Sequence, residues 1–288
     1  MKRNNRIHSV VWYIAVIIIS LTTVLPFLWT ISTSFKGDSE ILSGAMNLIP
    51  KQFTLAHYKE VFETMPFQKY LKNSLILALG GVATNLFFGS LAGYAFGQLR
   101  FRGKKSLFMV FLSSMMIPSI VTMIPTFIVL RSFPLAGGNN LFGDGGLGLI
   151  NSYWAILLPG AAGAFSIFFM KQFFEQLPKE LGESARMDGA SEFKIFWTVY
   201  LPLAKPALTT LGIMTFQAGW NAFMWPMIVL NSEEMKTVQV GLAAFQYNYN
   251  TNYGPLMAGT ILATLPVLVL FVIVQRNYVQ GLAEAGIK

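Results

Sequence analysis

Six long apolar segments alternate with polar segments along the 288-residue chain, and none of the six contains an ionised side chain. A helix needs about 20 apolar residues to cross about 30 Å of hydrocarbon, so each segment can span a bilayer once. The pattern therefore predicts an all-α, polytopic membrane protein with six transmembrane helices. The segments are residues 9–34, 73–99, 106–130, 145–170, 206–231 and 251–275.

Composition narrows the possible chemistry. Only 12% of the residues are charged, about half the share typical of soluble domains. The chain has no cysteine and two histidines, which excludes disulfides, thiol catalysis and cysteine-ligated metals. No lysine, histidine or carboxylate lies within a span, which argues against a proton-coupled carrier. We expect no catalytic residue and no metal site in this chain, and an energy source outside it.

The distribution of basic residues predicts the orientation. If both termini are cytoplasmic, 14 of the 21 Lys and Arg residues fall on the cytoplasmic side, as the positive-inside rule requires. The net charge of +8 then reflects basic loops beside the bilayer, and no nucleic-acid partner is expected. The fourteen are Lys2, Arg3, Arg6, Arg100, Arg102, Lys104, Lys105, Lys171, Lys179, Arg186, Lys194, Lys205, Arg276 and Lys288.

The loops divide the chain into three parts. Residues 1–35 contain the cytoplasmic N-terminus and first span, and residues 36–72 form an external loop. Residues 73–288 form a core domain with five spans and a cytoplasmic loop at 177–205. The glycine-rich stretch 137–149 is expected to be a flexible external connector, since its single carboxylate is too few for a calcium site.

The 177–205 loop reads as two short helices. Glu183 lies in the early part of the first helix, where the helix dipole favours negative charge. Gly189 provides a left-handed exit from that helix, and Ser191 can cap the second helix. Pro202 is expected to end the second helix, whose apolar face is formed by Phe193, Trp197 and Tyr200.

This loop resembles that of the membrane subunits of ATP-binding-cassette (ABC) importers, which carries a Glu-Ala-Ala motif, then a glycine and a Leu-Pro pair. The motif stands here as Glu183-Ser184-Ala185, and serine replaces the middle alanine. The tail from Gln275 to Lys288 and the Asp188-Gly189-Ala190 form resemble the carbohydrate branch, specifically the six-span partner in maltose-type systems.

The resemblance implies a type I ABC importer permease fold and a function. The chain would be the permease subunit that carries an oligosaccharide or related sugar across the cytoplasmic membrane of a prokaryote by alternating access. Its partners would be a second permease, two ATPase subunits and an extracytoplasmic solute-binding protein. ATP and Mg would bind to the ATPases, so this chain would be no enzyme and would hold no cofactor.

The resemblance also implies roles for residues of the loop. Its first helix would dock in a cleft of the ATPase, with Glu183 in polar contact, Ala185 in close packing and Gly189 at the bend. Asp188 would hold the loop by capping or by pairing with Arg186. The full set of ATPase-coupling residues is Glu183, Ser184, Ala185, Asp188, Gly189 and Pro202.

Two polar sets could contact the transported solute or its carrier. Asn85, Gln217, Trp220 and Asn221 lie near mid-bilayer and could line a sugar path, because sugars bind aromatic faces and amides. Equally, such amides hold helices together and tryptophans fill cores. The external residues Tyr247, Asn248, Tyr249 and Asn250 could reach the binding protein, or could form an interfacial tyrosine belt.

Two other functions remain open at this point. One is a stand-alone channel or ion-coupled carrier, which would need no ATPase partner. The other is an ABC permease for another small solute, such as a sugar phosphate. The absence of basic residues from the spans disfavours an anion.

Overall fold

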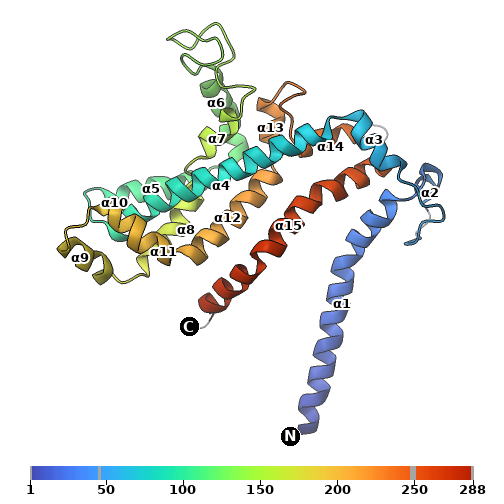
Figure 1. Ribbon diagram of the computed structural model, residues 1–288, viewed down its shortest axis with the longest axis horizontal. Coiled ribbons are helices and arrows are strands. Elements are labelled where there is room, and N and C mark those ends of the chain that lie inside the picture. The colour runs from blue at the N-terminus through green and yellow to red at the C-terminus, as the bar shows by residue number, and fades with distance from the viewer. Residues whose placement is uncertain (1, 45–46, 247–250, 287–288) are drawn as a thin grey trace. The chain divides into compact units, whose positions relative to one another are not determined.

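The computed structural model describes residues 2–44, 47–246 and 251–286. Within these ranges the chain is helical, and its one strand-like feature is an isolated pairing of Gln246 with Thr251. The chain forms two compact units (Figure 1). The first is Met1–Gln68 with Gly241–Pro266, and the second is Lys69–Val240 with Val267–Lys288.

The first unit is held together around the buried ring of His57. The Nε2 atom of this ring lies 2.7 Å from the Lys36 carbonyl oxygen. Gly254 lets the ring approach the backbone, since an added Cβ there would lie 2.2 Å from it. The elements of the unit are α1 (Lys2–Ser34), α2 (Asp38–Leu42), α3 (Ala56–Thr64), η2 (Ala243–Phe245) and the first part of α15 (Tyr253–Gly286).

The second unit is built along α4 (Phe67–Gln98), beside which α8 and α12 pack (Figure 1). The remaining elements, in chain order, are α5 (Lys104–Met115), α6 (Ser119–Arg131), α7 (Trp154–Gly160), α8 (Ala164–Glu175), α9 (Glu180–Met187), α10 (Glu192–Ile195), the π-helix η1 (Phe196–Tyr200), α11 (Leu201–Leu203), α12 (Lys205–Trp220) and α13 (Met224–Val229); α14 (Val238–Leu242) leads into the first unit.

The helices confirm an all-α membrane architecture but not all six predicted spans. Three of those described are long and apolar enough to cross a membrane: α1, α4 and α15. Two bent pairs, α5 with α6 at 104° and α7 with α8 at 40°, raise the count to five if each pair is one span. The predicted span 206–231 forms α12 and α13, which are interrupted at residues 221–223, so neither reaches spanning length.

A stripe of glycines brings α4 and α8 into close contact. Gly89, Gly93 and Gly97 recur at every fourth residue, so they share one face of α4. A Cβ at Gly93 would lie 2.5 Å from the Met170 Cβ, and one at Gly97 would lie 2.9 Å from the Phe174 Cβ. Small residues at this spacing allow membrane helices to pack backbone to backbone. Substitution of any of these glycines would push the two helices apart.

The glycine-rich stretch 137–149 is ordered by hydrogen bonds, in contrast to the expected flexible connector. The buried side chain of Asn139 donates to the carbonyls of Arg131 and Phe133 and accepts from the Gly146 amide. Gly148 has a φ of +58°, and a Cβ there would lie 2.2 Å from the Leu130 carbonyl oxygen. The glycines therefore serve close backbone packing, which composition alone does not distinguish from flexibility.

Candidate coupling site and translocation path

The 177–205 loop has the predicted helix–bend–helix form. Helix α9 ends at Met187, and Gly189 follows with a φ of +79°, in the left-handed region that glycine enters without strain. The Ser191 side chain caps α10 by accepting a hydrogen bond from the Lys194 amide at 3.4 Å. The Ala190 amide donates to the Ala185 carbonyl, which closes the end of α9. Local turn chemistry thus sets this bend.

The second helix ends at Leu203, one residue beyond the predicted end at Pro202. The chain continues from α10 through η1 into α11, and Pro202 lies within α11. The π-helical turn before it shifts the hydrogen-bond register, which accommodates a residue that has no amide proton. Ala204, whose ψ of 6° departs from helical geometry, separates α11 from α12.

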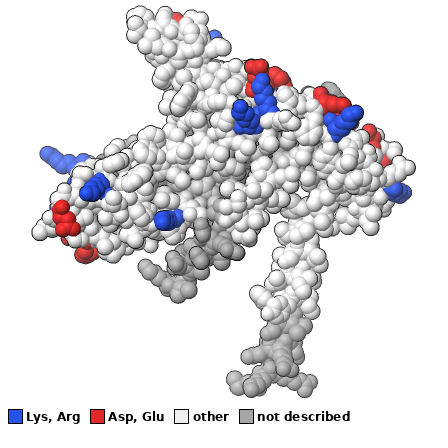
Figure 2. Space-filling model, viewed as in Figure 1, with Lys and Arg blue, Asp and Glu red and all other residues white. Residues whose placement is uncertain are grey.

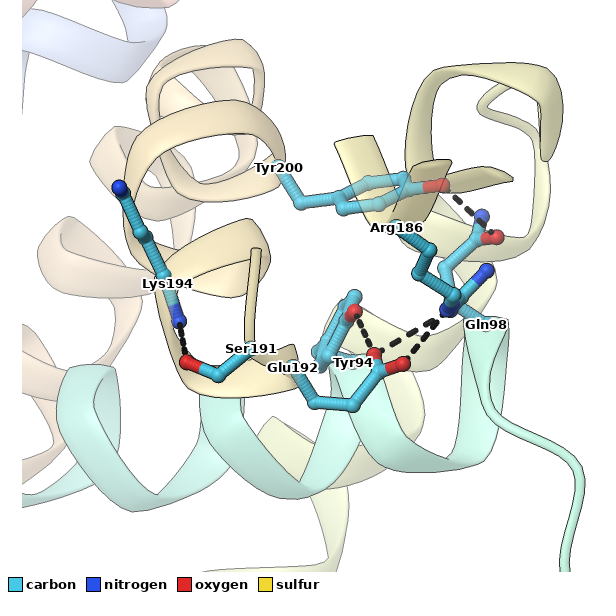
Figure 3. A network of polar contacts seen from close by, with 7 residues as sticks. All are labelled: Tyr94, Gln98, Arg186, Ser191, Glu192, Lys194 and Tyr200. Carbon is cyan, nitrogen blue, oxygen red and sulfur yellow. Dashed lines mark hydrogen bonds and ion pairs between the residues drawn. The ribbon is translucent and has the colours of Figure 1, made fainter. Parts of the chain in front are cut away.

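Arg186 pairs with Glu192 rather than with Asp188, as Figure 3 shows. Arg186 Nε lies 2.5 Å from Glu192 Oε1, and its Nη2 lies 3.2 Å from Oε2. The hydroxyl of Tyr94 on α4 donates to the same carboxylate at 2.9 Å. Asp188 is the C-terminal cap of α9, where its own backbone amide donates to the Ser184 carbonyl. The pair therefore bridges the bend at Gly189 and fastens both short helices to α4.

A second polar contact fixes the loop to α4 one turn further along. The Gln98 amide donates to the carbonyls of Phe174 and Leu177, and its Oε1 lies 3.2 Å from the Tyr200 hydroxyl (Figure 3). That hydroxyl also lies 3.3 Å from the Pro178 carbonyl, so its single proton serves one acceptor at a time. A Cβ at Gly182 would lie 2.9 Å from the hydroxyl, so a larger residue at this buried position of α9 would displace the Tyr200 hydroxyl.

These contacts shift the pKa values of two loop residues. The hydrogen bond from Arg186 lowers the pKa of the Glu192 carboxyl, and the bond from Tyr94 acts in the same direction. Burial raises the pKa of the Tyr200 phenol. At neutral pH Glu192 is therefore ionised and Tyr200 is protonated, the two states that the hydrogen bonds need.

The two faces of α9 differ in what they contact. Gly182 and Ala185 face inward, and Ala185 packs against the buried cluster of Tyr94, Met170, Phe174, Ile195, Phe196, Tyr200, Ala204, Ala207 and Leu211. Glu183 and Ser184 are exposed, and the Ser184 hydroxyl bonds within its own helix, to the Glu180 and Leu181 carbonyls. Met187 is 89% exposed. A large apolar side chain so exposed on an otherwise anchored helix is typical of a surface that another protein covers.

The candidate path residues on α12 fall into two groups. Trp220 is 2% exposed and stacks on Phe216 with ring centroids 5.7 Å apart, whereas Gln217 and Asn221 are exposed on one face of the helix. Gln217 lines a hollow of about 280 Å³ between α12 and α15. The amides that share a face are thus separated from the tryptophan, which lies on the packed side of the helix. The hollow is lined by Ile213, Met214, Phe216, Gln217, Val267, Leu270, Phe271 and Gln275.

Asn85 lies in a fully bonded position between α4 and the break that separates α7 from α8. Its Nδ2 donates to the carbonyls of Gly81 and Gly160 at 3.0 and 2.7 Å. Its Oδ1 accepts from the Ser166 hydroxyl at 2.7 Å and from the Gly163 amide at 3.3 Å. With donors and acceptors all engaged, Asn85 satisfies the backbone that the break would leave unpaired.

The candidate binding-protein contact, residues 247–250, lies outside the described residues. The segment that leads to it is tied to the start of α4. The Asn73 side chain donates to the carbonyls of Glu234 and Lys236 at 2.8 and 2.9 Å, and Tyr70 donates to the Glu233 carboxylate. The Val238 amide donates to Ser74 at 2.9 Å. Sequence reasoning missed this clamp because its two halves are some 160 residues apart.

The charged side chains lie mainly at the ends of the second unit. On the face shown in Figure 2, they gather near α9 and α10 and near the start of α4, and a broad uncharged surface lies between. An uncharged band between charged ends is what a bilayer requires.

Comparison with known proteins agrees with this arrangement. A family model described as the binding-protein-dependent transport system inner membrane component matches residues 70–284. The chain belongs to this family. It is therefore a membrane permease subunit, and the matched range includes the 177–205 loop and its anchor on α4.

The permease is similar to several known relatives along nearly its whole length. It is 33% identical to the arabinooligosaccharides transport system permease protein AraQ of Halalkalibacterium halodurans over 273 residues, which cover 94% of this chain and 93% of that protein. It is 32% identical to the lactose transport system permease protein LacG of Rhizobium radiobacter, with 96% of each chain covered. It is 31% identical to the galactooligosaccharides transport system permease protein GanQ of Bacillus subtilis, with 100% and 98% covered.

Solved structures support the same fold. A chain of a bacterial ABC transporter involved in the import of the acidic polysaccharide alginate superimposes on the permease with a TM-score of 0.80 at 28% identity, over 95% of this chain and 97% of that chain. A chain of the methionine transporter MetNI matches with a TM-score of 0.54 at 17% identity, over 75% and 95%, and bears on the fold alone. The permease thus has the fold of type I ABC importers.

Proposed function

We propose that this permease carries an oligosaccharide or related sugar across the cytoplasmic membrane of a prokaryote by alternating access, driven by separate ATPase chains. The observation that carries the proposal is the exposed face of α9, whose helix is joined to the spanning helix α4 through the Arg186–Glu192 pair and Tyr94. A helix that is anchored on one side and exposed on the other can transmit a movement of a bound partner to the membrane helix.

In this proposal the ATPase cleft receives the outward face of α9. Glu183 and Ser184 supply polar contacts, and Met187 supplies the apolar anchor, because its large side chain is almost fully exposed. Ala185 and Gly189 act within the loop, the first by packing inward and the second by forming the bend. Pro202 sits beyond the π-helical turn and contributes stiffness rather than contact.

The substrate class follows from the relatives, which are named for the transport of arabinooligosaccharides, lactose and galactooligosaccharides. Gln217 and Asn221 are the best-supported path residues, because both are exposed on one face of α12 and offer amides without charge. Neutral amides beside apolar walls suit hydroxyl-rich solutes. Asn85 and Trp220 act as supports for that path.

The assembly would contain a second permease, two ATPase subunits that bind ATP and Mg, and a solute-binding protein outside the membrane. We infer that both termini are cytoplasmic and that the chain crosses the bilayer six times, with α12 and α13 together forming the fifth crossing. Residues 247–250 are the proposed binding-protein contact, and the clamp at the start of α4 holds the segment that precedes them.

The decisive experiment is site-specific cross-linking. The chain has no cysteine, so Met187→Cys introduces one reactive thiol without further engineering. A thiol-reactive photo-cross-linker at that position should capture an ATPase chain in native membranes. Leu107→Cys is the matched control, since Leu107 is 48% exposed on α5 and should capture no ATPase. Capture of no ATPase from Met187 would overturn the proposal.

A transport assay tests the substrate class. The reconstituted complex should import radiolabelled neutral oligosaccharides only when ATP and the binding protein are both present. Import without ATP would indicate a channel or carrier, and import restricted to sugar phosphates would overturn the assignment of a neutral sugar.

A further inference from the structure

A basic hollow lies at the start of α5, and its lining includes none of the candidate coupling or path residues. Its volume is about 550 Å³, and it opens between the first turns of α5 and the end of α8. The lining residues are Phe101, Gly103, Lys104, Lys105, Ser106, Phe108, Lys171 and Glu175. Nothing in the proposed transport cycle uses this hollow.

The positive charge of the hollow exceeds its negative charge. Glu175 is the one carboxylate in the lining, and it is already paired with Lys171 at 2.5 Å. Lys171 Nζ also lies 4.8 Å from the centre of the Phe108 ring, which fixes this lysine against the wall. The single negative charge of the lining is therefore already neutralised by Lys171.

Two further cations line the same hollow, and two more lie in the turn that precedes α5. Within the described part of the chain, Lys104 and Lys105 have no ion pair, and neither do Arg100 and Arg102 in the adjoining turn. Lys104 Nζ donates to the Leu99 carbonyl at 2.9 Å, which holds it at the mouth but does not neutralise its charge. The opening is thus suited to an anionic group.

Exposed apolar side chains follow the hollow along α5. Phe101 is 41% exposed at its rim, and along α5 the side chains of Leu107, Met109 and Val110 are 48, 53 and 66% exposed. A small inorganic anion would satisfy the lysines and leave this surface bare. A molecule with an anionic head and apolar chains would satisfy both.

We propose that this hollow binds the headgroup phosphate of an anionic phospholipid, whose acyl chains lie along the exposed face of α5. Lys104 and Lys105 contact the phosphate, Lys171 supports it from α8, and Phe101 and Phe108 flank the glycerol. Basic pockets between membrane helices at the bilayer surface recognise lipid headgroups in this way. The proposal requires only that the protein lies in a membrane, so it is independent of the transported solute.

The hollow is distinguished from a diffuse basic surface by its geometry. Arginines and lysines that merely follow the positive-inside rule attract anionic lipids without saturation and are interchangeable. Two lysines at the mouth of one cavity should instead bind a fixed number of lipids. The affinity should then depend on which lysines are substituted.

Lipid retention by the intact complex tests the proposal. The complex is purified through this chain in mild detergent, and bound phosphatidylglycerol and phosphatidylcholine are counted by native mass spectrometry during titration. We expect saturable phosphatidylglycerol binding, and binding at least about tenfold weaker when Lys104→Gln and Lys105→Gln are combined, since each cation near a lipid surface contributes to affinity. The single variant Lys105→Glu, at an exposed position, should weaken binding without any demand on folding.

The matched control removes two exposed charges from the same end of the unit, with Lys194→Gln and Lys205→Gln combined. Equal loss of lipid in this control would assign the effect to general surface charge and overturn the proposal. Displacement of the lipid by inorganic phosphate at similar concentration would also overturn it, because the site would then recognise a small anion. Since no ATP or sugar is present, the result stands apart from the transport proposal.

Discussion

Arg186 and Glu192 pair across the bend at Gly189, with Arg186 Nε 2.5 Å from Glu192 Oε1, and the same carboxylate accepts a hydrogen bond from Tyr94 on α4. This places one ion pair between the exposed surface of α9 and a membrane-spanning helix. A displacement of α9 therefore reaches α4 through few intermediates, which is the property that the proposed function needs.

Loss of this ion pair should uncouple transport. Arg186→Ala leaves Glu192 with the Tyr94 bond alone, and the loop loses about 1 kcal/mol because the pair is partly exposed. We expect sugar uptake by the reconstituted complex to fall several-fold while ATP hydrolysis is retained. Uptake and hydrolysis are measured in the same proteoliposomes, with Lys194→Ala as the control on α10. An unchanged ratio of uptake to hydrolysis would contradict the coupling role.

The ion pair should also determine how the stability of the loop changes at acid pH. Because Arg186 lowers the pKa of Glu192 in the folded state, its stabilising contribution is complete above the ordinary carboxyl pKa of about 4.3. This contribution to stability is lost as the pH falls through the lowered pKa of Glu192 in the folded state. Hydrogen exchange of residues 183–190 should therefore stay constant from about pH 8 to 5 after correction for intrinsic rates. Glu192→Gln should raise exchange at neutral pH and remove the acid transition, and a transition near neutral pH would contradict this reasoning.

The effect of a substitution at Gly189 should depend on the free energy that the new residue needs to adopt the left-handed conformation. No atom lies within 4 Å of the position that a Cβ would take there, so the penalty is conformational alone, about 1–2 kcal/mol for an ordinary residue. Gly189→Val should reduce uptake strongly, whereas Gly189→Asn should reduce it little because asparagine enters this region more readily. Both variants should insert in the membrane at wild-type level. Equal uptake by the two would show that the bend conformation is irrelevant.

The glycine stripe should stabilise the packing of α4 against α8. Gly93→Ala places a methyl group against Met170 and should cost about 1–3 kcal/mol by overpacking. Gly81→Ala, on the same helix with nothing within 4 Å, is the matched control and should be neutral or slightly stabilising. The measurement is the thermal stability of the purified complex in detergent. Similar melting of both variants would mean that α4 and α8 are not closely packed.

Substitutions of the candidate path residues should have different effects on the packed and exposed faces of α12. Trp220→Ala removes a buried ring and should cost about 3–5 kcal/mol, so the amount of assembled complex falls. Gln217→Ala and Asn221→Ala alter exposed amides and should lower uptake per assembled complex, with no loss of the complex itself. Quantitative blotting of membranes together with initial uptake rates distinguishes the two effects. Normal uptake by both amide variants would remove them from the path.

Much of the architecture follows from the sequence alone, because its causes are local. Uninterrupted apolar segments predict membrane helices, and Gly189 and Ser191 set the bend and the cap of the 177–205 loop through their own backbone and side-chain chemistry. The Glu183-Ser184-Ala185 motif indicated the family in the same local way. Hydropathy, turn conformation and short motifs need no knowledge of neighbours in space.

Tertiary structure decided which residues meet. It paired Arg186 with Glu192 instead of Asp188, turned Trp220 into the packed side of α12, and tied Asn85 to the break between α7 and α8. It also explains the glycines on one face of α4, because they allow α8 to approach within backbone contact. These outcomes depend on the rotation of each helix about its axis and on partners far along the chain, which no local pattern specifies.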